Sequence, residues 1–435
     1  MKIDVMTKDK DTKTVVPALR FPEFRDGEGW HNVRLIDVTD KRIKWHFTGG
    51  PFGSNLKASD YTNSGIRVIQ LQNIGDGYFV EDYKIYTSIE KSDELLGCNI
   101  YPGNIIMSKM GDPVGRACLI PDNEDRYLMC SDGIKLVIDE DKNDKYFIIK
   151  AINAEEFRRK IERSATGSTR KRISLDTLRD LTLLISNNKV EQKKIAECLG
   201  SLDDLISAVA DKIETLKEYK KGLMQQLFPA EGKTIPAIRF PEFRNAPDWQ
   251  EMSLRDIGEI ITGSTPCTKD SNNYGGEKLF VSPADITDKR YVSQTKTTLS
   301  EKGFRLSRRI KENSILFVCI GSTIGKVAQN TRECATNQQI NSIMPYKGHV
   351  ADFVYSILEH YAPQIASIAG NQAVPIINKT LFSSVSLLMP KEEEQKKIAD
   401  CLLSVDELIS TEIDKLDQLK AHKKGLMQQL FPKLQ

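Results

Sequence analysis

Apolar residues recur at alternating steps of four and three positions along two long segments of the chain. In the first segment, residues 191–227, the apolar seam positions are Ile195, Leu199, Leu202, Ile206, Val209, Ile213, Leu216, Leu223 and Leu227, and Lys220 fills one further position of the seam. Residues 394–430 repeat the pattern. This spacing is typical of a heptad seam, so we expect two long helices that pack on each other. A Phe-Pro pair ends each segment, and proline cannot continue a helix.

The two segments are copies of one sequence. Residues 191–229 and 394–432 are identical at 27 of 39 positions, at a fixed offset of 203. A second phrase, PALRFPEFR at 17–25, recurs as PAIRFPEFR at 236–244. The order leader, variable block, long helix therefore occurs twice, which indicates a duplicated domain rather than a solenoid. For the helices to pair, the second must run antiparallel to the first and finish near the leader.

The variable blocks predict a mixture of strands and helices. Short apolar runs are bounded by Gly, Pro, Asn and Asp, which is typical of strands and turns. These runs are 66–71, 104–108, 117–120 and 134–138 in the first block, and 278–281, 314–319, 326–328 and 341–345 in the second. Each block then has a helical stretch, 144–163 or 350–369, and a short strand, 181–185 or 385–389. The predicted fold class is α+β.

Composition restricts the function classes only slightly. The chain has 435 residues and a net charge of only +2, from 62 Lys and Arg against 60 Asp and Glu, so any basic footprint must be local. The eight cysteines form no CxxC pair, and neither a zinc site nor a disulfide framework is expected. Cysteines of this kind favour reduced thiols in a cytoplasmic protein. No run of 18 apolar residues occurs, which argues against a membrane span.

Matched loops of the two blocks hold different polar residues. TGGPFGSN at 48–55 corresponds to TGSTP at 262–266, and QLQN at 70–73 corresponds to SPAD at 282–285. Asn and Gln pair with adenine, and Arg or Lys with guanine, in the major groove, so such tips suit base reading. The base-reading candidates are Ser54, Asn55, Gln70, Gln72, Asn73, Lys109, Ser168, Thr169, Ser264, Thr265, Lys326, Asn337, Gln338, Gln339, Asn371 and Gln372.

Local basic clusters are candidate contacts to DNA phosphates. Residues 155–172 contain seven basic and three acidic side chains, and residues 302–311 contain five basic and no acidic ones. Phosphate contacts position a protein on DNA without specifying sequence. The candidates are Arg158, Arg159, Lys160, Arg170, Lys171, Arg172, Arg305, Arg308, Arg309 and Lys311.

Both helices end in the apolar phrase GLMQQLF. A single partner helix cannot cover every side of such a tip, so the phrase suits docking of another protein, although it also suits capping of the adjacent block. The docking candidates are Leu223, Met224, Phe228, Leu426, Met427 and Phe431.

Catalytic motifs are not found. The phrase GSTIGK at 321–326 is one residue short of a phosphate loop and lacks the following Ser or Thr that would hold Mg²⁺. HExxH, GxSxG and the Asp/Asn-Pro-Pro-Tyr/Phe tetrad of amino-methyltransferases do not occur. The five histidines are scattered along the chain. We expect neither catalytic residues nor a metal site.

The duplicated architecture, together with VPALRFPEFRDGEGW and the transitions LISNNKVEQKKIAECL and LLMPKEEEQKKIADCL, resembles the specificity subunit of type I restriction-modification systems. The resemblance covers both halves. It implies two target-recognition domains separated by antiparallel coiled-coil helices with pseudo-two-fold symmetry. The implied segments are a leader at 1–30, domain 1 at 31–187, a central helix at 188–229, a linker at 230–249, domain 2 at 250–388 and a C-terminal helix at 389–435.

The resemblance also implies the function and the partners. Each domain would read one half of an asymmetric, bipartite site in double-stranded DNA, with an unread spacer. The helices would dock two methyltransferase subunits, and restriction subunits would join that core. S-adenosylmethionine, ATP and Mg²⁺ would belong to those partners and not to this chain.

Two other classes of function stay open from the sequence. A coiled-coil scaffold that binds only protein would explain the helices but not the basic loops. A nuclease or methyltransferase fused to its own DNA reader would need catalytic motifs that the sequence lacks. DNA binding with and without a methyltransferase subunit, and turnover by the isolated chain, distinguish these classes.

Overall fold

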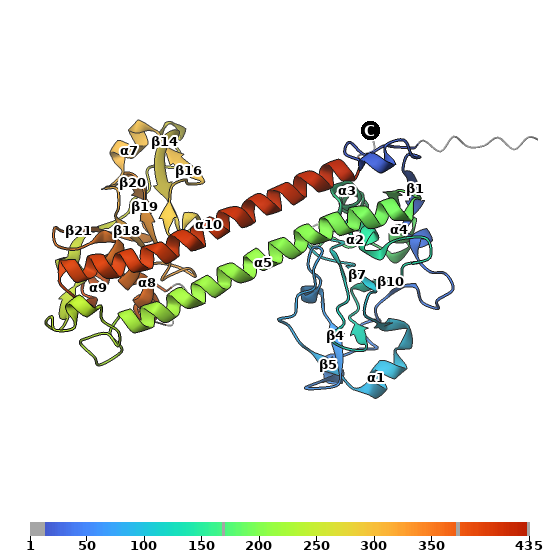
Figure 1. The fold of residues 1–435 in the computed structure, drawn as a ribbon, viewed down its shortest axis with the longest axis horizontal. Coiled ribbons are helices and arrows are strands. Elements are labelled where there is room, and N and C mark those ends of the chain that lie inside the picture. Colours follow the sequence, from blue (N-terminus) through green and yellow to red (C-terminus); the bar gives the residue numbers. More distant parts are fainter. Residues whose placement is uncertain (1–13, 168–169, 371–374, 433–435) are drawn as a thin grey trace, which may run out of the picture. The chain divides into compact units, whose positions relative to one another are not determined.

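The computed structural model describes residues 14–167, 170–370 and 375–432. The chain divides into two compact units (Figure 1). Unit 1 comprises residues 1–205 and 419–435, and unit 2 comprises residues 206–418. Both units contain strands and helices, which confirms the α+β prediction.

The two predicted long helices are present. Helix α5 spans Lys189–Leu227 and helix α10 spans Glu392–Leu430, each with 39 residues. The side chain of Asn188 caps the start of α5 by accepting a hydrogen bond from Val190 N at 2.9 Å. Prolines 229 and 432 follow the ends of the helices, as expected. By these bounds α5 begins in unit 1 and ends in unit 2, and α10 does the reverse.

Within unit 2 the helices pair antiparallel. Lys212 of α5 contacts Glu412 of α10 at 2.5 Å, and Lys220 contacts Asp406 at 2.6 Å, so residue numbers rise along one helix as they fall along the other. Lys220 thus fills its apolar seam position as half of a buried ion pair. Its repeat counterpart, Lys423, pairs in unit 1 with Asp203, which is the counterpart of Asp406.

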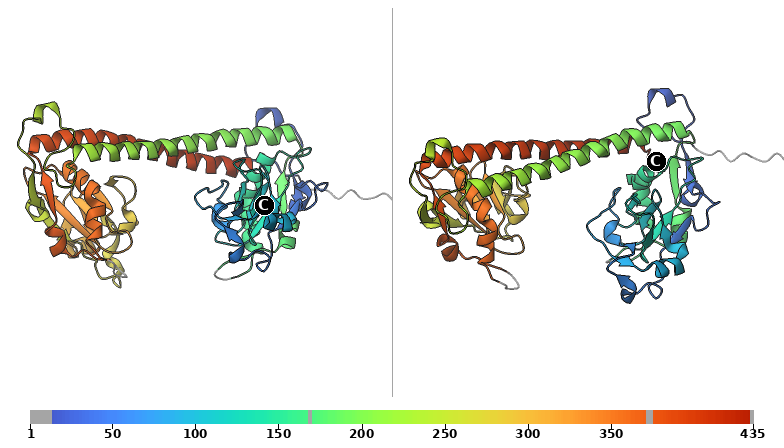
Figure 2. Two further views of the ribbon diagram at one scale, coloured as in Figure 1. Left: turned by 90° about the horizontal axis from the view of Figure 1, so that it is seen from below. Right: turned by 60° about the horizontal axis from the view of Figure 1, so that its bottom comes forward.

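Unit 1 contains three sheets beside the helices (Figure 2). Their strand orders are β1-β11, β2-β10-β7-β8 and β3-β5-β4-β9-β6. The strands are β1 His31–Arg34, β2 Phe47–Gly49, β3 Tyr61–Thr62, β4 Ile66–Ile69, β5 Tyr86–Thr87, β6 Asn99–Ile100, β7 Ile105–Ser108, β8 Ala117–Leu119, β9 Tyr127–Met129, β10 Gly133–Leu136 and β11 Thr182–Ile185. The helices are α1 Ile89–Glu94, α2 Lys145–Asn153, α3 Glu155–Ser164 and α4 Leu175–Asp180.

Unit 2 repeats this topology with two differences: β15 adds a strand beside β19, and the single strand β14 takes the places of β3 and β4. Its sheets have the orders β12-β22, β13-β21-β18-β19-β15 and β16-β14-β20-β17. The strands are β12 Gln250–Ser253, β13 Gly258–Thr262, β14 Tyr274–Val281, β15 Tyr291–Val292, β16 Thr297–Leu299, β17 Arg309–Ile310, β18 Ile315–Val318, β19 Val327–Asn330, β20 Cys334–Thr336, β21 Ile340–Pro345 and β22 Ser386–Met389. The helices are α6 Leu254–Ile257, α7 Glu301–Leu306, α8 Ala351–Ser367 and α9 Lys379–Ser383.

One predicted element is wrong. The stretch 144–163 was expected to form a single helix, but it forms α2 and α3, which are separated at Ala154 by an extended backbone with φ −66° and ψ 146°. The break lets both helices bury an apolar face in the same core, through Phe147 and Ile148 of α2 and Phe157 of α3.

The leader docks onto the end of a helix in each unit. Leu19 N donates to Gln429 O of α10 at 3.0 Å, and its counterpart Ile238 N donates to Gln226 O of α5 at 3.0 Å. The arginine that follows this residue in each copy binds the first turn of the other long helix in the same unit, which is α5 in unit 1 and α10 in unit 2. Arg20 forms two hydrogen bonds with Glu191, at 2.6 and 2.9 Å, and Arg239 forms the same pair with Glu394, at 2.7 Å for both bonds.

Candidate nucleic-acid interface

The candidate loops of unit 1 meet at one turn, residues 130–133, which lies between β9 and β10. Backbone hydrogen bonds connect this turn to the ends of three strands. Cys130 N donates to Ile69 O at 3.0 Å, Gly50 N donates to Gly133 O at 2.8 Å, and Lys109 N donates to Asp132 O at 2.7 Å. The loops at 49–56, 70–73, 109–116 and 130–133 therefore form one edge, which we call loop edge 1.

The basic segment 170–173 joins loop edge 1. Gly111 N donates to Lys171 O at 3.1 Å, and Ile173 N donates to Lys109 O at 3.0 Å. The guanidinium of Arg172 donates to the carboxylate of Asp132 at 2.7 Å. Candidate phosphate contacts and candidate base-reading loops are thus brought to the same place.

Unit 2 builds the same edge with the same backbone bonds. The loops at 262–266, 282–285, 319–326 and 336–340 form this second edge, loop edge 2. Its bonds are Asn337 N to Val281 O at 3.0 Å, Gly263 N to Ile340 O at 3.0 Å, Cys319 N to Gln339 O at 2.8 Å, Gly321 N to Pro375 O at 3.1 Å and Ile377 N to Cys319 O at 2.8 Å. Each has a counterpart in unit 1, so one scaffold presents two different sets of side chains.

A glycine fixes the first loop of each edge. A Cβ added at Gly50 would lie 1.7 Å from Cys130 O, and one added at Gly263 would lie 2.1 Å from Asn337 O. These two hydrogen bonds to the turn can therefore form only where the residue has no side chain, so glycine is needed at both positions.

Asn73 is not available for base reading, which corrects that prediction. Its side chain is fully buried. Its Oδ1 accepts from Gln70 N at 2.9 Å, and its Nδ2 donates to Val80 O and Tyr83 O at 2.9 and 2.8 Å. Asp285 occupies the matched position in unit 2 and accepts from Ser282 N at 2.9 Å. Both residues cap a short turn, so their polar side-chain atoms are used in hydrogen bonds within the loop.

The other base-reading candidates differ in exposure. The exposed ones are Ser54, Asn55, Gln72, Thr265, Lys326 and Gln338. The partly buried ones are Gln70, Lys109, Ser264, Asn337 and Gln339. Ser168, Thr169, Asn371 and Gln372 lie outside the described residues.

Two phosphate candidates of unit 1, Arg158 and Lys160, are committed to partners in poorly solvated positions. Lys160 donates to Thr182 O at 2.8 Å, and Arg158 lies 3.7 Å from Asp76. Burial withdraws both charges from water and so lowers the pKa of both side chains. Arg159 pairs with Glu155 at 3.3 Å. We therefore remove Arg158 and Lys160 from the phosphate candidates because of their burial. Lys171 and Arg172 also have acidic partners, Glu162 and Asp132, but like Arg159 their side chains are at least 40% exposed, so these three stay candidates together with Arg170.

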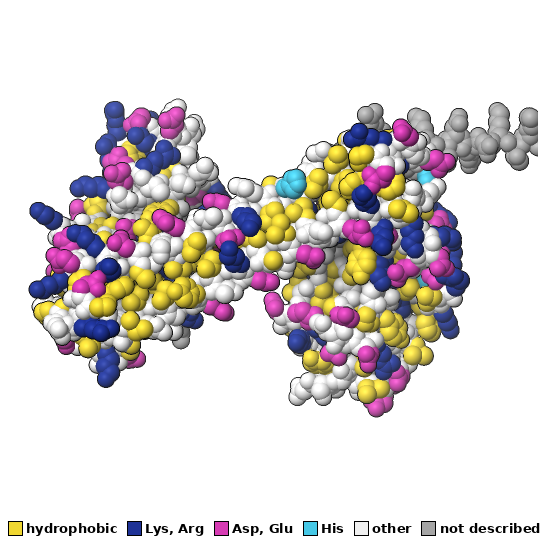
Figure 3. Space-filling model, viewed as in Figure 1, with side chains coloured by type: hydrophobic (Ala, Val, Ile, Leu, Met, Phe, Trp, Pro, Cys, Tyr) yellow, Lys and Arg dark blue, Asp and Glu magenta, His cyan; other side chains and the backbone are white. Residues whose placement is uncertain are grey.

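The basic candidates of unit 2 are exposed and lie in α7 and in the residues that follow it. Arg305, Arg308, Arg309 and Lys311 are all exposed, and Lys and Arg side chains gather at this end of the unit, at upper left in Figure 3. Arg308 also donates to Thr262 O at 2.8 Å, so it is attached to loop edge 2. This patch and this edge together can contact a polyanion.

The helix tips cap the globular blocks, which corrects the docking prediction. Met224, Phe228 and Phe431 are buried in the cores of their own units. The ring of Phe431 lies 5.8 Å from that of Trp30, and the ring of Phe228 lies 6.3 Å from that of Trp249. Leu223, Leu426 and Met427 are partly buried against the same cores. A partner cannot reach the three buried side chains.

Each unit has a groove on the helix repeat that extends from the turn before the tip into the tip itself. The groove of unit 2 has a volume of about 600 Å³, and that of unit 1 about 540 Å³. Both contain the same helix positions, which are Lys217, Lys220, Lys221, Met224 and Gln225 in unit 2 and Lys420, Lys423, Lys424, Met427 and Gln428 in unit 1. We call them the repeat grooves.

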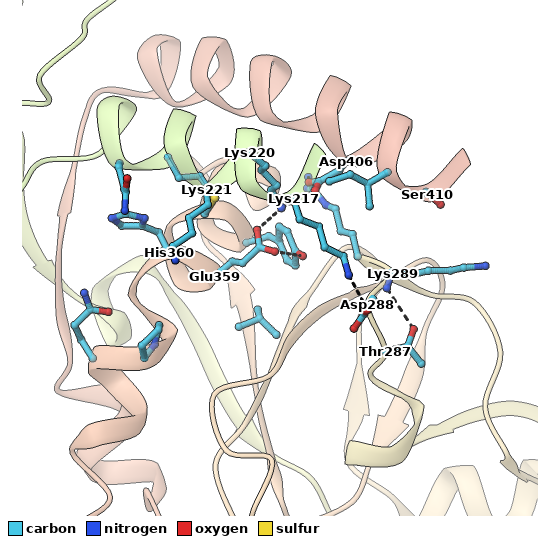
Figure 4. Close-up of a pocket in the computed structure, with 18 residues that line it drawn as sticks. Lys217, Lys220, Lys221, Thr287, Asp288, Lys289, Glu359, His360, Asp406 and Ser410 are labelled. Carbon is cyan, nitrogen blue, oxygen red and sulfur yellow. Dashed lines mark hydrogen bonds and ion pairs between the residues drawn. The ribbon is translucent and has the colours of Figure 1, made fainter. Parts of the chain in front are cut away.

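Only some of the lysines in these grooves form ion pairs with acidic residues. In unit 2, Lys217 pairs with Asp288 at 2.9 Å, and Lys220 pairs with Glu359 and Asp406 (Figure 4). Lys221 and its counterpart Lys424 are exposed, and neither has an ion pair within the described residues. Each groove therefore keeps an exposed lysine that has no acidic partner within the described residues, beside the methionine at the matched position, Met224 or Met427.

Sequence reasoning missed two structural features of the site. Asp132 and Ser131 lie at the centre of loop edge 1, and the Asp-Gly pair between two apolar runs was the available signal. The ion pairs Arg20–Glu191 and Arg239–Glu394 were also missed, although each residue lies in a duplicated phrase.

The described residues show neither a metal cluster nor a membrane-spanning helix. No three His, Cys, Asp or Glu side chains gather there as metal ligands would. None of the helices in the part of the chain that the structure describes is long and apolar enough to cross a bilayer.

Comparison with known proteins identifies the family. The model of the type I restriction modification DNA specificity domain matches residues 27–218 and 247–421, one match in each half of the chain. The HindI specificity subunit of Haemophilus influenzae is 25% identical over 436 residues, which cover 84% of this chain and 90% of that protein. The MjaIX specificity subunit of Methanocaldococcus jannaschii is 30% identical over 167 residues, covering 37% of this chain and only 39% of that protein.

Solved structures share the fold. The type I restriction-modification S subunit from M. genitalium matches with a TM-score of 0.61 at 16% identity, over 97% of this chain and all of that one. A chain from a study of complex assembly in the type I system matches with a TM-score of 0.52 at 14% identity, over 93% of this chain and 97% of that one.

Each half of the chain thus presents one loop edge on a duplicated scaffold, and the DNA specificity domain model matches each half. The chain belongs to the type I restriction-modification DNA specificity family. It is a non-catalytic specificity subunit.

Proposed function

We propose that this subunit reads an asymmetric, bipartite site in double-stranded DNA with an unread spacer. Residues 31–187 and 250–388 would be the two target-recognition domains, and loop edges 1 and 2 would each read one half-site. The observation that carries this proposal is the set of matched backbone bonds that hold both edges in one arrangement. Different side chains on the same scaffold suit two different half-sites.

The long helices suit the role of spacer between the readers. A helix of 39 residues is about 58 Å long at about 1.5 Å per residue. One turn of DNA is about 34–36 Å, so such a helix is long enough to serve two major grooves.

We further propose that the repeat grooves dock two methyltransferase subunits, one in each groove. Two grooves built from identical helix positions fit two copies of one partner, and Lys221 and Lys424 fit an acidic surface on it. Restriction subunits would join through that core. S-adenosylmethionine, ATP and Mg²⁺ would be bound by the partners.

Phosphate contacts can be distinguished from base contacts by how strongly the DNA affinity depends on salt concentration. In the reconstituted complex, changing Arg305 and Lys311 to alanine should weaken binding to cognate and scrambled duplexes alike. Each lost phosphate contact should lower the slope of log K against log salt by about 0.9. Binding isotherms at several salt concentrations measure both quantities. An unchanged slope would remove these residues from the interface.

Changing Gln72 to alanine should act only on the cognate duplex. A lost bidentate base contact costs about 1–3 kcal/mol of discrimination. Gln338→Ala, an exposed glutamine in the turn of loop edge 2, is the parallel variant in unit 2 and should affect the other half-site. Equal losses on cognate and scrambled DNA would show that these glutamines support the loops rather than read bases.

The docking proposal predicts a stepwise loss of partners. Lys221→Glu should reduce the methyltransferase content of the complex from two copies to one, and so should Lys424→Glu, because each change repels an acidic surface at one groove. The double variant should lose both copies. Native mass spectrometry counts them, and Lys347→Glu, exposed and outside both grooves, is the control. A double variant that retains two copies would contradict the proposal.

A further inference from the structure

The loop at 49–56 presents a phenylalanine to solvent beside the base-reading candidates of loop edge 1. The side chain of Phe52 is 82% exposed, more than any other large hydrophobic side chain in the described residues. Single exposed apolar residues are common on protein surfaces and need no function. The case for Phe52 therefore depends on how its loop is held.

The loop is anchored on both sides of Phe52. On one side, Gly50 is hydrogen-bonded to Gly133 and has no room for a side chain, and Pro51 is buried. On the other side, Leu56 is buried at 8% exposure. Between them, Asn55 N donates to Phe52 O at 2.8 Å and closes a turn. The scaffold thus fixes where Phe52 projects, although Phe52 contributes little to the core.

The anchored turn adjoins polar candidates of the same edge. Pro51 and Leu56 line a cavity of about 280 Å³ together with Gln70, Gln72 and Asp132. Ser54 and Asn55, which follow Phe52, are exposed. An apolar ring next to amide and hydroxyl groups is the combination that a thymine needs, because its major-groove edge offers a 5-methyl group beside a carbonyl acceptor.

We propose that Phe52 packs against the 5-methyl group of a thymine in the half-site read by loop edge 1, and so contributes to specificity there. This inference rests on the proposed function. The matched loop of unit 2, Thr262 to Pro266, has no aromatic residue. The contact is therefore confined to one half-site.

The test removes the methyl group from the DNA and the ring from the protein. Each thymine of the cognate site is replaced singly by uracil, which lacks only the 5-methyl group. The reconstituted wild-type complex should lose about 3- to 10-fold in affinity at one thymine of the first half-site. Phe52→Ala should lose a similar factor on the unmodified site and be indifferent to uracil at that position. Phe52→Leu should recover part of the discrimination.

The matched control is Tyr101→Ala. Tyr101 is also exposed in unit 1, but it precedes β7, whereas loop edge 1 follows the other end of that strand. Its variant should bind as the wild type does and keep the sensitivity to uracil. Phe52 is so exposed that its replacement leaves the core intact, and thermal unfolding verifies this.

Three outcomes would overturn the inference. The first half-site could contain no thymine, or the Phe52→Ala complex could keep the full response to uracil. The third is that Phe52→Ala lowers the affinity by the same factor on the thymine and the uracil duplexes. In each case the wild type still recognises a bipartite site. Failure of the proposed function looks different, because the wild-type complex would then show no preference for any duplex.

Discussion

Replacing residues 31–187 with the corresponding block of a relative is expected to change one half of the methylated site completely and to leave the other half and the spacer unchanged. The block begins with β1 and ends just after β11, and these two strands pair with each other, His31 opposite Ile185. The exchange therefore carries a closed structural element. Sequencing of methylated DNA from cells that express the reconstituted complex measures the outcome.

The donor block must keep the contacts that attach it to the helices. The Phe147 ring lies 5.5 Å from that of Phe431, Lys150 pairs with Asp203, and Asp144 N donates to Gln192 Oε1 at 2.8 Å. A donor with an aromatic residue at 147, a lysine at 150 and any residue except proline at 144 preserves them, because the bond to Gln192 uses the backbone N–H of residue 144. The reciprocal exchange of residues 250–388 is the matched control and should alter only the other half. A change in both half-sites after either exchange would contradict the modular assignment.

The long helices and most of the strands could be predicted because their signals are local or repeated. The heptad spacing of 191–227 and the Phe-Pro stop depend on neighbouring residues alone, and the duplication confirmed them within one sequence. The break at Ala154 could not be predicted. It results from two apolar faces that must reach one core, which is a tertiary requirement that helical periodicity does not contain.

The roles of individual polar residues were the least predictable part of the site. Gln72 and Asn73 are adjacent in sequence and equally suited to pair with adenine, yet Gln72 is exposed and Asn73 is buried as the cap of a turn. The comparison with unit 2 held a clue, because Asp285 at the matched position suits the same cap. Similarly, the apolar residues at the helix ends predicted that these ends are covered. They did not predict whether another protein or the adjacent globular block covers them.

The two buried ion pairs between leader and helix are expected to have the largest effect on stability. Glu191 is fully buried. Arg20 also donates to Gly27 O and Glu28 O, at 3.0 and 2.8 Å. Its guanidinium therefore connects the leader segment both to residues 27–28 and to α5. The hydrogen bonds with Glu191 raise the pKa of Arg20. Because Glu191→Gln leaves a buried guanidinium without a counter-charge, it should lower the free energy of unfolding by about 3–5 kcal/mol.

Glu394→Gln tests the same device in unit 2, where Arg239 makes the equivalent bonds to Ala246 O and Pro247 O, at 2.8 and 2.9 Å. Denaturant unfolding of the two single variants should show comparable losses, each in the transition of its own unit. Glu392→Gln is the control, because its ion pair with Lys396 is on the surface of the same helix, and surface pairs contribute little. Its unfolding midpoint should not move. If Glu191→Gln and Glu394→Gln behaved like this control, the attachment of leader to helix would depend on the packing around Trp30 and Trp249 instead of on the ion pairs.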